Sequence, residues 1–279
     1  MAVIPASNGT HPHPPIARMP FFHYNSIDII HGGINLHHWE PLCPGGLSFV
    51  YDDALFRPGT DSFLLGSFPR LRPGLRVCDL GSGTGLLGLL LLQRQRQLSV
   101  TGVELLPEAV QLAEQAAARN GLTDRLTFCQ GDLRDIRALL PAGSFDLAVC
   151  NPPYYPAGSG RLPEAEALRA ARSETGCTLE DVCAAAAYLL RWGGSFCLVH
   201  KPERLADLCC ALRETGLEPK RLRLVCKNAA SAPSLILLEA RRGGRPGLAI
   251  EPALLLQTSD GTPTAEVYAI YFRQQEDLS

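Results

Sequence analysis

The tetrapeptide Asn151-Pro152-Pro153-Tyr154 combines residue types that can hold and stack a flat group bearing an amino nitrogen. Its two prolines restrict the backbone, so the Asn151 side-chain carbonyl and the Pro152 backbone carbonyl can be fixed as neighbouring acceptors. Two such acceptors grip an amino group and stabilise the positive charge that grows on its nitrogen during group transfer. Tyr154 can stack on the ring that carries this nitrogen. The alternative interpretation is a proline-rich turn with a surface tyrosine.

A second motif, Gly81-Ser82-Gly83-Thr84-Gly85, follows a stretch that predicts a strand and opens one that predicts a helix. Glycines allow the backbone to turn tightly and to approach a ligand closely, and the start of a helix adds unsatisfied N–H groups. The spacing is G-x-G-x-G, whereas a dinucleotide fingerprint would have its third glycine at Leu86. Alone, the loop is therefore also consistent with a glycine-rich turn that binds nothing.

Three acidic residues fall at the ends of successive expected strands. Asp79 begins the glycine loop and can receive a ligand ammonium group or pin the turn. Glu104 closes the second strand, where a carboxylate can hold both hydroxyls of a ribose. Asp132 follows the third strand and can accept a hydrogen bond from an adenine amino group or orient its loop. Because ligands of parallel sheets bind beyond the carboxyl ends of the strands, the three acids together favour a ligand-binding site.

These motifs lie in a regular alternation of expected elements. Strands are expected at 75–80, 99–105, 126–130, 145–150, 194–200, 221–227 and 234–240, and helices at 61–68, 84–95, 107–120, 133–140, 178–191 and 203–215. Such alternation predicts a mostly parallel, doubly wound α/β sheet. The last two strands have no helix between them, which predicts an antiparallel hairpin at the sheet edge.

Length and composition fit one large α/β domain. The chain has 279 residues, 46% of them hydrophobic and 19% charged, with a net charge of −2, so it is not a polycation. Residues 1–19 predict a disordered, proline-rich tail. The remainder, 20–279, is expected to form a single domain, with a hairpin-like extension over 20–70 and a C-terminal extension over 246–279. Nothing in the sequence demands a dimer, so we expect a monomer or a weak dimer.

The ten cysteines are expected to be free, because none forms a C-x-x-C pair and several fall in apolar runs. Free thiols and the lack of a visible signal peptide favour the reducing cytosol. The longest apolar stretch, 86–92, is too short to cross a bilayer. His11 and His13 in the tail make a poor metal site, so no metal and no membrane partner is expected.

Residues 219–245 carry seven basic residues against Glu239 alone, a local charge of +6. A phosphate-binding patch for RNA is one interpretation, and a solvated sheet edge is the other. The residues that we expect to contact RNA are Arg172, Lys220, Arg221, Arg223, Lys227, Arg241 and Arg242.

Together, the Asp79-x-Gly-x-Gly-x-Gly loop, Glu104, Asp132 and the Asn-Pro-Pro-Tyr tetrapeptide resemble class I S-adenosylmethionine-dependent methyltransferases that modify amino nitrogens, over about residues 49 to 245. Further features narrow the resemblance to the bacterial valine-tRNA (adenosine-37 N6)-methyltransferase family. They are Arg57-Pro-Gly-Thr-Asp-Ser, the extension of the tetrapeptide to Gly160, Cys177-Thr-Leu-Glu-Asp and the run from Lys220 through Gly247. The resemblance implies a Rossmann-like, seven-stranded methyltransferase sheet with an antiparallel edge hairpin.

The resemblance also implies the cofactor, S-adenosylmethionine, and the target, the N6 amino group of an adenine in RNA, most specifically adenosine 37 of valine tRNA. Asn151, Pro152, Pro153 and Tyr154 would hold the adenine. The expected cofactor-binding residues are Thr60, Asp61, Asp79, Gly81, Ser82, Gly83, Gly85, Glu104, Leu105, Asp132, Leu133 and Asn151.

Two other acceptors keep the same chemistry. The tetrapeptide also occurs in methyltransferases that act on a glutamine side-chain amide of release factors, and related tetrapeptides occur in enzymes that act on guanine N2 of ribosomal RNA. The glutamine type usually has a helical N-terminal domain, for which residues 1–48 look too short. A third hypothesis is an RNA-binding or cofactor-sensing module without activity, against which the intact tetrapeptide and the three acids argue.

Overall fold

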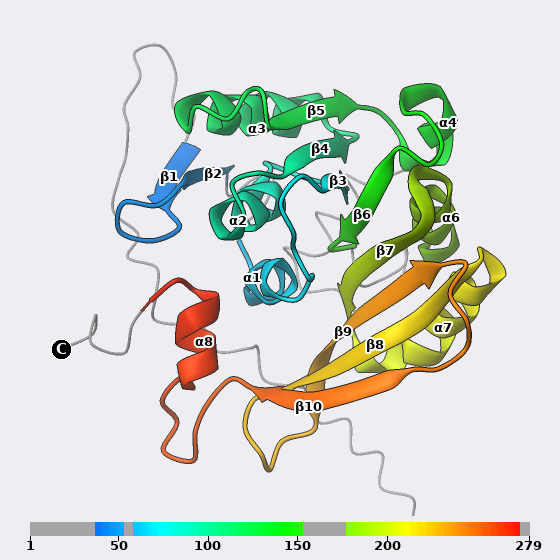
Figure 1. Cartoon of the computed structure of the whole chain (residues 1–279). Coiled ribbons are helices and arrows are strands. Elements are labelled where there is room, and N and C mark those ends of the chain that lie inside the picture. The colour runs from blue at the N-terminus through cyan, green and yellow to red at the C-terminus, as the bar shows by residue number, and fades with distance from the viewer. Residues whose placement is uncertain (1–36, 53–57, 153–176, 274–279) are drawn as a thin grey trace, which may run out of the picture.

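Apolar strands form the centre of the computed structural model, which describes residues 37–52, 58–152 and 177–273. Within these residues, the main sheet has eight strands in the order β10-β8-β9-β7-β6-β3-β4-β5 (Figure 1). Their bounds are β3 (Arg76–Leu80), β4 (Ser99–Glu104), β5 (Leu126–Gln130), β6 (Phe145–Cys150), β7 (Leu190–His200), β8 (Leu217–Cys226), β9 (Pro233–Arg242) and β10 (Ala249–Leu255). Only β9 runs antiparallel to its neighbours, so the carboxyl ends of the other seven lie along one edge.

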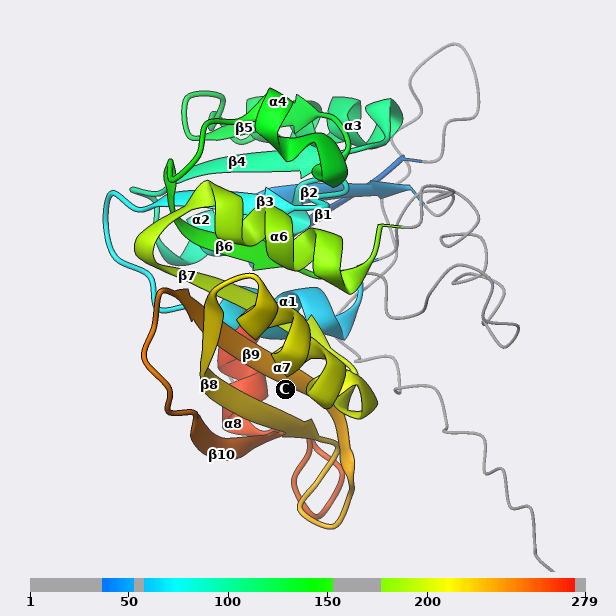
Figure 2. The same cartoon turned by 90° about the vertical axis from the view of Figure 1, so that its right-hand side faces the viewer.

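Helices cover both faces of this sheet and give it two hydrophobic cores. They are α1 (Thr60–Ser67), α2 (Leu86–Arg94), α3 (Pro107–Arg119), α4 (Ile136–Leu139), α6 (Leu179–Leu189), α7 (Leu205–Glu214) and α8 (Ala265–Ile270). Residues of α1, α2, α3 and α8 share one core, and residues of α4, α6 and α7 share the other. Figure 2 shows α6 and α7 on the near face of the sheet, with α1 and α8 behind it. The α/β class expected from the alternation is confirmed.

The side chains of each strand divide between these cores as a pleated strand requires. Val77 of β3 and Leu147 of β6 point into the core of α1 and α2, whereas Cys78 and Ala148, one residue further along each strand, point into the core of α6. Apolar side chains on both faces of a strand are typical of a parallel sheet that is covered on both sides. All ten cysteines are free thiols, and five of them lie in strands of this sheet.

The main sheet has one strand more than the seven that we expected. The hairpin of β8 and β9 is antiparallel, as predicted, but β10 pairs with β8 in parallel and takes the edge position. This strand is difficult to recognise in the sequence because it contains Pro252, and proline cannot donate a backbone hydrogen bond to a neighbouring strand. In the structure it falls between Glu251 and Leu254, where the register with β8 shifts.

Local signals set most helix ends. Pro107 occupies the first turn of α3, and Thr178 and Asp181 form a capping box at the start of α6. The helix expected at 178–191 ends earlier, at Leu189, because β7 begins at Leu190 rather than at Gly194. The segment expected as one short helix at 133–140 is a turn of 3-10 helix (Leu133–Asp135) followed by α4.

A separate antiparallel pair, β1 (His37–Pro41) and β2 (Ser48–Asp52), packs beside α2 and α3 (Figure 1). The Asn120 side chain makes two hydrogen bonds to the backbone of Ser48: its Oδ1 accepts from the Ser48 N–H at 2.8 Å, and its Nδ2 donates to the Ser48 carbonyl at 2.7 Å. The Leu47 N–H donates to Gln93 Oε1 at 2.9 Å. The hairpin is thus tied to two helices that also flank the glycine loop. No helix in the described ranges is long and apolar enough to span a membrane.

Candidate active site

Three glycines shape the turn between β3 and α2. Backbone φ is 73° at Gly81, 53° at Gly83 and 82° at Gly85, a left-handed region that glycine adopts without steric cost. A Cβ at Gly81 or Gly83 would meet no atom within 4 Å, whereas one at Gly85 would lie 2.8 Å from the ring of Phe128. The loop is therefore closed by packing at Gly85 and open at the other two glycines, where a ligand can approach the backbone.

Glu104, the last residue of β4, fixes this loop in place. Its Oε2 accepts from the Gly83 N–H at 2.9 Å, and its Oε1 accepts from the Leu106 N–H at 2.9 Å. A carboxylate has about four acceptor positions, so both oxygens keep capacity for ligand hydroxyls after these bonds. The structure brings Glu104 to the loop, as the positions of the strand ends predicted.

Asp79 and Ser82 carry buried polar atoms that need a partner. Asp79 is 2% exposed, and neither its Oδ2 nor the Ser82 Oγ has a hydrogen-bond partner among the residues that the structure describes. Burial, followed by the neighbouring charge of Glu104, raises the pKa of Asp79 from 3.8 to about 7. An unsatisfied carboxyl group under an open glycine loop is able to pair with a cationic ligand group.

Asp132 follows β5 at the same edge and is already paired. Arg134 forms a two-pronged ion pair with it, with Nη2 at 2.6 Å from Oδ2 and Nε at 3.0 Å from Oδ1, and the Arg134 N–H also donates to Oδ1 at 2.9 Å. These bonds hold the pKa of Asp132 below its ordinary value. Arg134 was not expected at this site, although an arginine two residues after the predicted acid was a visible signal. Leu105 and Leu133, also expected to contact a cofactor, are half-buried beside Glu104 and Asp132.

Asn151 directly follows the carboxyl end of β6, and its side chain contacts helix α1. Its Nδ2 donates to Ser62 Oγ at 3.0 Å, and Ser62 is 3% exposed. Thr60 and Asp61, both expected to bind a cofactor, form the first turn of the same helix, and Asp61 Oδ1 accepts from the Ser62 N–H at 2.9 Å. The structure therefore brings the start of α1 to the first residue of the tetrapeptide. Pro153, Tyr154 and Arg172 lie outside the described residues, so their predicted roles stay predictions.

The predicted basic patch is divided by strand direction. Because β8 runs toward the carboxyl edge and β9 runs away from it, Lys227 lies at the edge of Asn151, whereas Arg241 and Arg242 lie at the opposite edge. Lys220 donates from Nζ to the carbonyls of Arg245 and Gly247, and Arg242 donates to the Leu190 carbonyl. Basic residues that are close together in sequence therefore lie at two opposite edges of the sheet.

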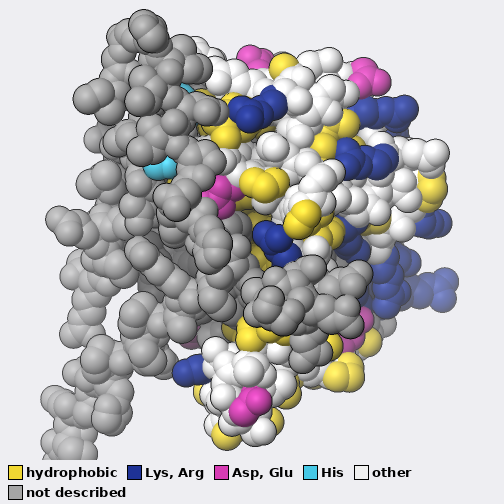
Figure 3. Space-filling view, turned by 90° about the vertical axis from the view of Figure 1, so that its left-hand side faces the viewer, with side chains coloured by type: hydrophobic (Ala, Val, Ile, Leu, Met, Phe, Trp, Pro, Cys, Tyr) yellow, Lys and Arg dark blue, Asp and Glu magenta, His cyan; other side chains and the backbone are white. Residues whose placement is uncertain are grey.

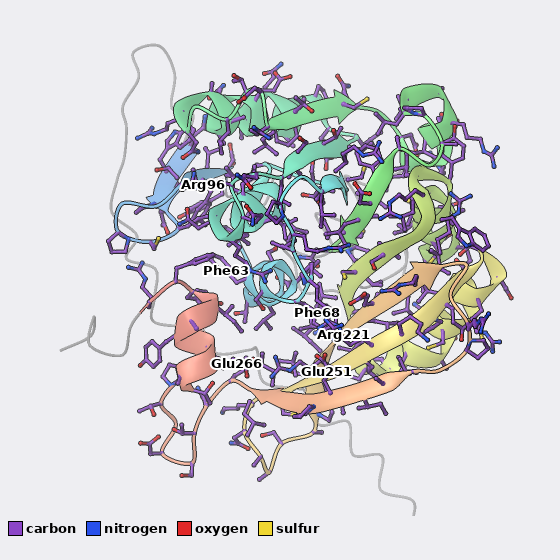
Figure 4. The ribbon with its side chains drawn as sticks, in the orientation of Figure 1. Phe63, Phe68, Arg96, Arg221, Glu251 and Glu266 are labelled. Carbon is purple, nitrogen blue, oxygen red and sulfur yellow. The ribbon has the colours of Figure 1, made fainter. Side chains whose placement is uncertain are left out.

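Arg221 and Arg223, which we expected to contact RNA, both form ion pairs within the fold. The Arg221 side chain is only 11% exposed, and its Nε lies 2.9 Å from Glu239 Oε2 while Nη1 lies 3.2 Å from Glu251 Oε1. Figure 4 shows Arg221 next to Glu251 and Phe68, and its guanidinium carbon lies 3.9 Å from the centre of the Phe68 ring. Arg223 makes two hydrogen bonds to the carboxylate of Glu266, of 2.6 and 2.8 Å.

Other arginines, which sequence reasoning did not single out, lie at the amino edge of the sheet. Arg70 and Arg72 precede β3, Arg76 begins it and Arg125 precedes β5, and all four are exposed. In the space-filling view of Figure 3, Lys and Arg side chains gather along the right-hand margin of the molecule. These residues are remote from the edge that carries Asn151, so we assign them no part in the site.

Comparison with known proteins agrees with this geometry. Residues 71–246 match a family model described as a methyltransferase domain. A tRNA1(Val) (adenine(37)-N6)-methyltransferase of Tolumonas auensis is 32% identical over 234 residues, which cover 81% of this chain and 95% of the relative. A protein of the same name from Porphyromonas gingivalis is 34% identical over 191 residues, or 66% of this chain and 74% of that one.

Among solved structures, a predicted O-methyltransferase from Agrobacterium tumefaciens superposes with a TM-score of 0.64 at 21% identity, over 76% of this chain and 96% of that one. At this identity the likeness shows the fold, which is the Rossmann-like methyltransferase fold that the resemblance implied. Fold, glycine loop, acids and sequence relatives agree, and the chain belongs to the tRNA1(Val) (adenine(37)-N6)-methyltransferase family.

Proposed function

We propose that this enzyme transfers a methyl group from S-adenosylmethionine to the N6 amino group of adenosine 37 in a valine tRNA. The observation that carries the proposal is the juxtaposition, at one sheet edge, of the open glycine loop and Asn151. The name of the Tolumonas relative, which matches over 95% of its length, supports this substrate.

The residues present fit the cofactor. The open backbone at Gly81 and Gly83 accommodates a close ligand, and the unsatisfied Oδ2 of Asp79 suits its ammonium group. Glu104 has acceptor capacity for ribose hydroxyls, and Asp132 has it for the adenine amino group if it shares its oxygens with Arg134. When bound, S-adenosylmethionine supplies an electrophilic methyl group on a positively charged sulfur.

Asn151 and Pro152 would then act on the target. The Asn151 Oδ1 and the Pro152 carbonyl accept hydrogen bonds from the amino group of the adenine, which orients the nitrogen lone pair toward the methyl group. The same two acceptors stabilise the positive charge that develops on nitrogen in the transition state. Positioning supplies most of the acceleration, and the charged product nitrogen loses its proton to water without a dedicated base. Tyr154 would stack on the extruded base and offset part of the cost of unstacking it.

RNA is the partner that this function requires. Lys227 is exposed at the edge of Asn151 and is the residue of the basic run best placed to contact a phosphate. We also propose that the protein is a monomer or a weak dimer and that it binds no metal. We further propose that it is located in the cytosol, where tRNA is modified.

The test is methyl transfer to defined acceptors. Purified protein is incubated with labelled S-adenosylmethionine and unmodified total tRNA, and the nucleosides are analysed by mass spectrometry. We expect N6-methyladenosine with the natural protein and none with Asn151→Ala, which should still bind the cofactor. Label in added release factor would instead establish the glutamine acceptor, and N2-methylguanosine in ribosomal RNA the guanine acceptor. Cofactor binding without any label transfer would contradict an enzymatic role.

A further inference from the structure

Trp192 is an exposed aromatic residue at the edge of the sheet opposite Asn151. It lies near the start of β7, and 74% of its surface is accessible to solvent. Only two other large hydrophobic residues in the described ranges are exposed, Leu248 and Ile250. A single exposed leucine or isoleucine is ordinary on a protein surface, whereas a tryptophan offers a wide flat ring that favours contact with a partner.

A glycine in the turn between β9 and β10 defines where this ring lies. Gly243 has a φ of 65°, and a Cβ at this position would overlap the indole ring of Trp192. The Gly243 N–H donates to the Gly216 carbonyl at 3.0 Å, which fixes the turn itself. Figure 2 shows this turn and the start of β7 together on the left-hand side of the sheet. The indole therefore rests against backbone on one side while most of it faces solvent.

Two acids near the ring are already paired with arginines. Asp146 forms ion pairs with Arg191, which directly precedes the tryptophan, at 2.5 Å and with Arg76 at 3.3 Å. Glu218 forms an ion pair with Arg213 at 3.2 Å. Because one carboxylate is shared between Arg191 and Arg76, this part of the surface keeps an excess of positive charge.

Four further basic residues come from β8, from the end of β9 and from the turn that follows it. Arg242 donates to the Leu190 carbonyl, and Lys220 donates from Nζ to the Arg245 carbonyl at 2.9 Å. These carbonyls are neutral, so they leave the charges uncompensated. Among the residues that the structure describes, none of the four forms an ion pair with a carboxylate; they are Lys220, Arg241, Arg242 and Arg245. The surface around Trp192 is therefore positive although the whole chain has a net charge of −2.

An exposed aromatic ring among uncompensated positive charges suits an unpaired stretch of RNA. Every base has a flat face that can stack on an indole, and the phosphates on either side of that base can pair with arginine and lysine. An apolar protein surface would cover the ring equally well, but it would take the basic groups out of water without supplying counterions. The combination of ring and charge thus favours RNA over an apolar protein partner.

The distance between this surface and the target site suits one RNA molecule. Asp146, which contacts the residue before Trp192, precedes Asn151 by five residues of extended chain, or about 17 Å. A tRNA is much longer than this distance. The same molecule can therefore place an adenine at Asn151 and another region at Trp192.

We propose that Trp192 and its basic neighbours form a second RNA-binding surface, on which an unpaired base of the substrate RNA stacks on the indole while the adjoining phosphates contact the arginines. The inference rests on the proposed function, because the RNA is the substrate of that reaction. No residue of this surface touches the reacting atoms. Its contribution is to RNA affinity, so its loss should appear in the KM for tRNA rather than in kcat.

Two substitutions of Trp192 separate stacking from simple apolar contact. Trp192→Leu keeps an apolar side chain without a flat ring, whereas Trp192→Phe keeps a ring. We expect Trp192→Leu to weaken the binding of unmodified tRNA at least about fivefold, as for the loss of one base–aromatic stack, and Trp192→Phe to weaken it less than about twofold. Ile250→Ala is the matched control, since it removes another exposed apolar side chain of the same sheet and should leave affinity unchanged. Equal affinities in all four proteins would overturn the proposal.

The phosphate contacts have a separate signature in the dependence of tRNA binding on salt. Arg245→Gln removes one exposed charge of the surface and should reduce the slope of log affinity against log salt by about one. The slope for Ile250→Ala should equal that of the natural protein. An unchanged slope in Arg245→Gln would show that this arginine contacts no phosphate and would contradict the proposed surface.

Tryptophan fluorescence tests the contact without any activity measurement. The chain has two tryptophans, and Trp39→Phe leaves Trp192 as the only emitter while keeping a ring beneath the Arg119 guanidinium. We expect unmodified tRNA to quench the emission of Trp192 with the Kd found by direct binding, and polyglutamate, a polyanion without bases, to leave it unchanged. Absence of quenching by tRNA, or equal quenching by both polymers, would refute stacking on the indole.

The outcomes also separate this proposal from the proposed function. Methylation of tRNA with normal affinity and KM in Trp192→Leu would refute the second surface and leave the function intact. A dimer of the natural protein that dissociates in Trp192→Leu, with tRNA affinity unchanged, would make the surface a contact between copies of this chain instead. If the natural protein methylates no RNA, the proposed function fails, and quenching by tRNA then decides on the surface alone.

Discussion

Thr84 in the glycine loop donates a 2.7 Å hydrogen bond from Oγ1 to the backbone carbonyl of Val50 in β2. Thr84 is 1% exposed and Val50 is fully buried, so water does not compete for this bond. Val50 precedes the region that matches the methyltransferase family model, residues 71–246. A hairpin outside the matched region therefore helps to fix the loop that is expected to bind the cofactor.

Thr84→Val should weaken both the fold and the cofactor site. The substitution keeps the shape of the side chain but leaves the buried Val50 carbonyl without its donor, at a cost of about 1–3 kcal/mol. We expect a lower Tm and a several-fold weaker affinity for S-adenosylmethionine, measured by thermal unfolding and calorimetric titration. Thr101→Val is the control, because the Thr101 hydroxyl makes only an exposed 3.4 Å contact with Thr127. Affinities equal to that control would show that the hairpin does not support the loop.

Asp79 predicts how cofactor affinity depends on pH. Its pKa of about 7 means that the carboxyl group becomes neutral as the pH falls below 7, and a neutral group attracts an ammonium ion less. Affinity for S-adenosylmethionine should therefore rise between about pH 5.5 and 7, by at most about tenfold per pH unit. Asp79→Asn should bind more weakly at pH 7 and lose this dependence. Parallel pH profiles for the two proteins in calorimetric titrations would rule out Asp79 as the titrating group.

The same shift affects stability with a defined sign. The folded protein without ligand retains a proton on Asp79 that the unfolded chain releases near its ordinary pKa of 3.8. This group therefore costs the fold stability as the pH rises from about 4 to about 7, and the cost is complete above that range. Asp79→Asn should consequently raise the Tm of the ligand-free protein at about pH 8 relative to its effect at about pH 4. An equal effect at both values would contradict the raised pKa.

Two glycines of the loop should respond differently to alanine. Gly85→Ala combines a positive φ with a Cβ that would lie 2.8 Å from Phe128, so it should destabilise the fold strongly. Gly81→Ala has the positive φ but open space around its Cβ, so it should cost only about 1–2 kcal/mol of stability. Because that open space is where we place the cofactor, Gly81→Ala should nevertheless bind S-adenosylmethionine much more weakly. Unimpaired binding by a folded Gly81→Ala protein would place the ligand elsewhere.

Arg221 and Lys227 separate fold stability from RNA binding. Arg221→Leu removes the partner of Glu239, which is 6% exposed, and an uncompensated buried charge costs about 3–5 kcal/mol. We expect a large loss in the free energy of unfolding in urea. Lys227→Ala should leave stability unchanged but weaken tRNA binding and reduce the slope of log affinity against log salt by about one. A reduced salt slope in the folded Arg221→Leu protein would return Arg221 to the RNA-binding surface.

The sequence predicted the parts of the fold that depend on local patterns. The apolar runs that became β3, β4, β5 and β6 and the turn at Gly81 to Gly85 could each be recognised from adjacent residues, and the polarity of parallel strands then placed Glu104 at the loop. The strand around Pro252 could not be recognised, because proline disfavours strands. This strand forms by pairing with the side of β8 that β9 leaves open, and nothing in the local sequence indicates that contact.

Contacts between residues far apart in the chain could not be predicted from this sequence alone. Nothing near Ser62 or Thr84 indicates that their hydroxyls meet Asn151 and the Val50 carbonyl. The basic run illustrates the opposite problem, because seven neighbouring charges suggest a single surface until strand direction separates Lys227 from Arg241. Burial of Arg221 depends on Glu251 of a strand that was not expected.

The most direct measurement maps the methyl group on one RNA. An unmodified valine tRNA transcript and the same transcript with guanosine in place of adenosine 37 are incubated with the protein and S-adenosylmethionine, then digested and analysed as fragments by mass spectrometry. The proposed function predicts one added methyl group in the anticodon-loop fragment of the first transcript, on N6 of adenosine 37, and none in the second. Equal methylation of both transcripts, or a methyl group at another position, would contradict it.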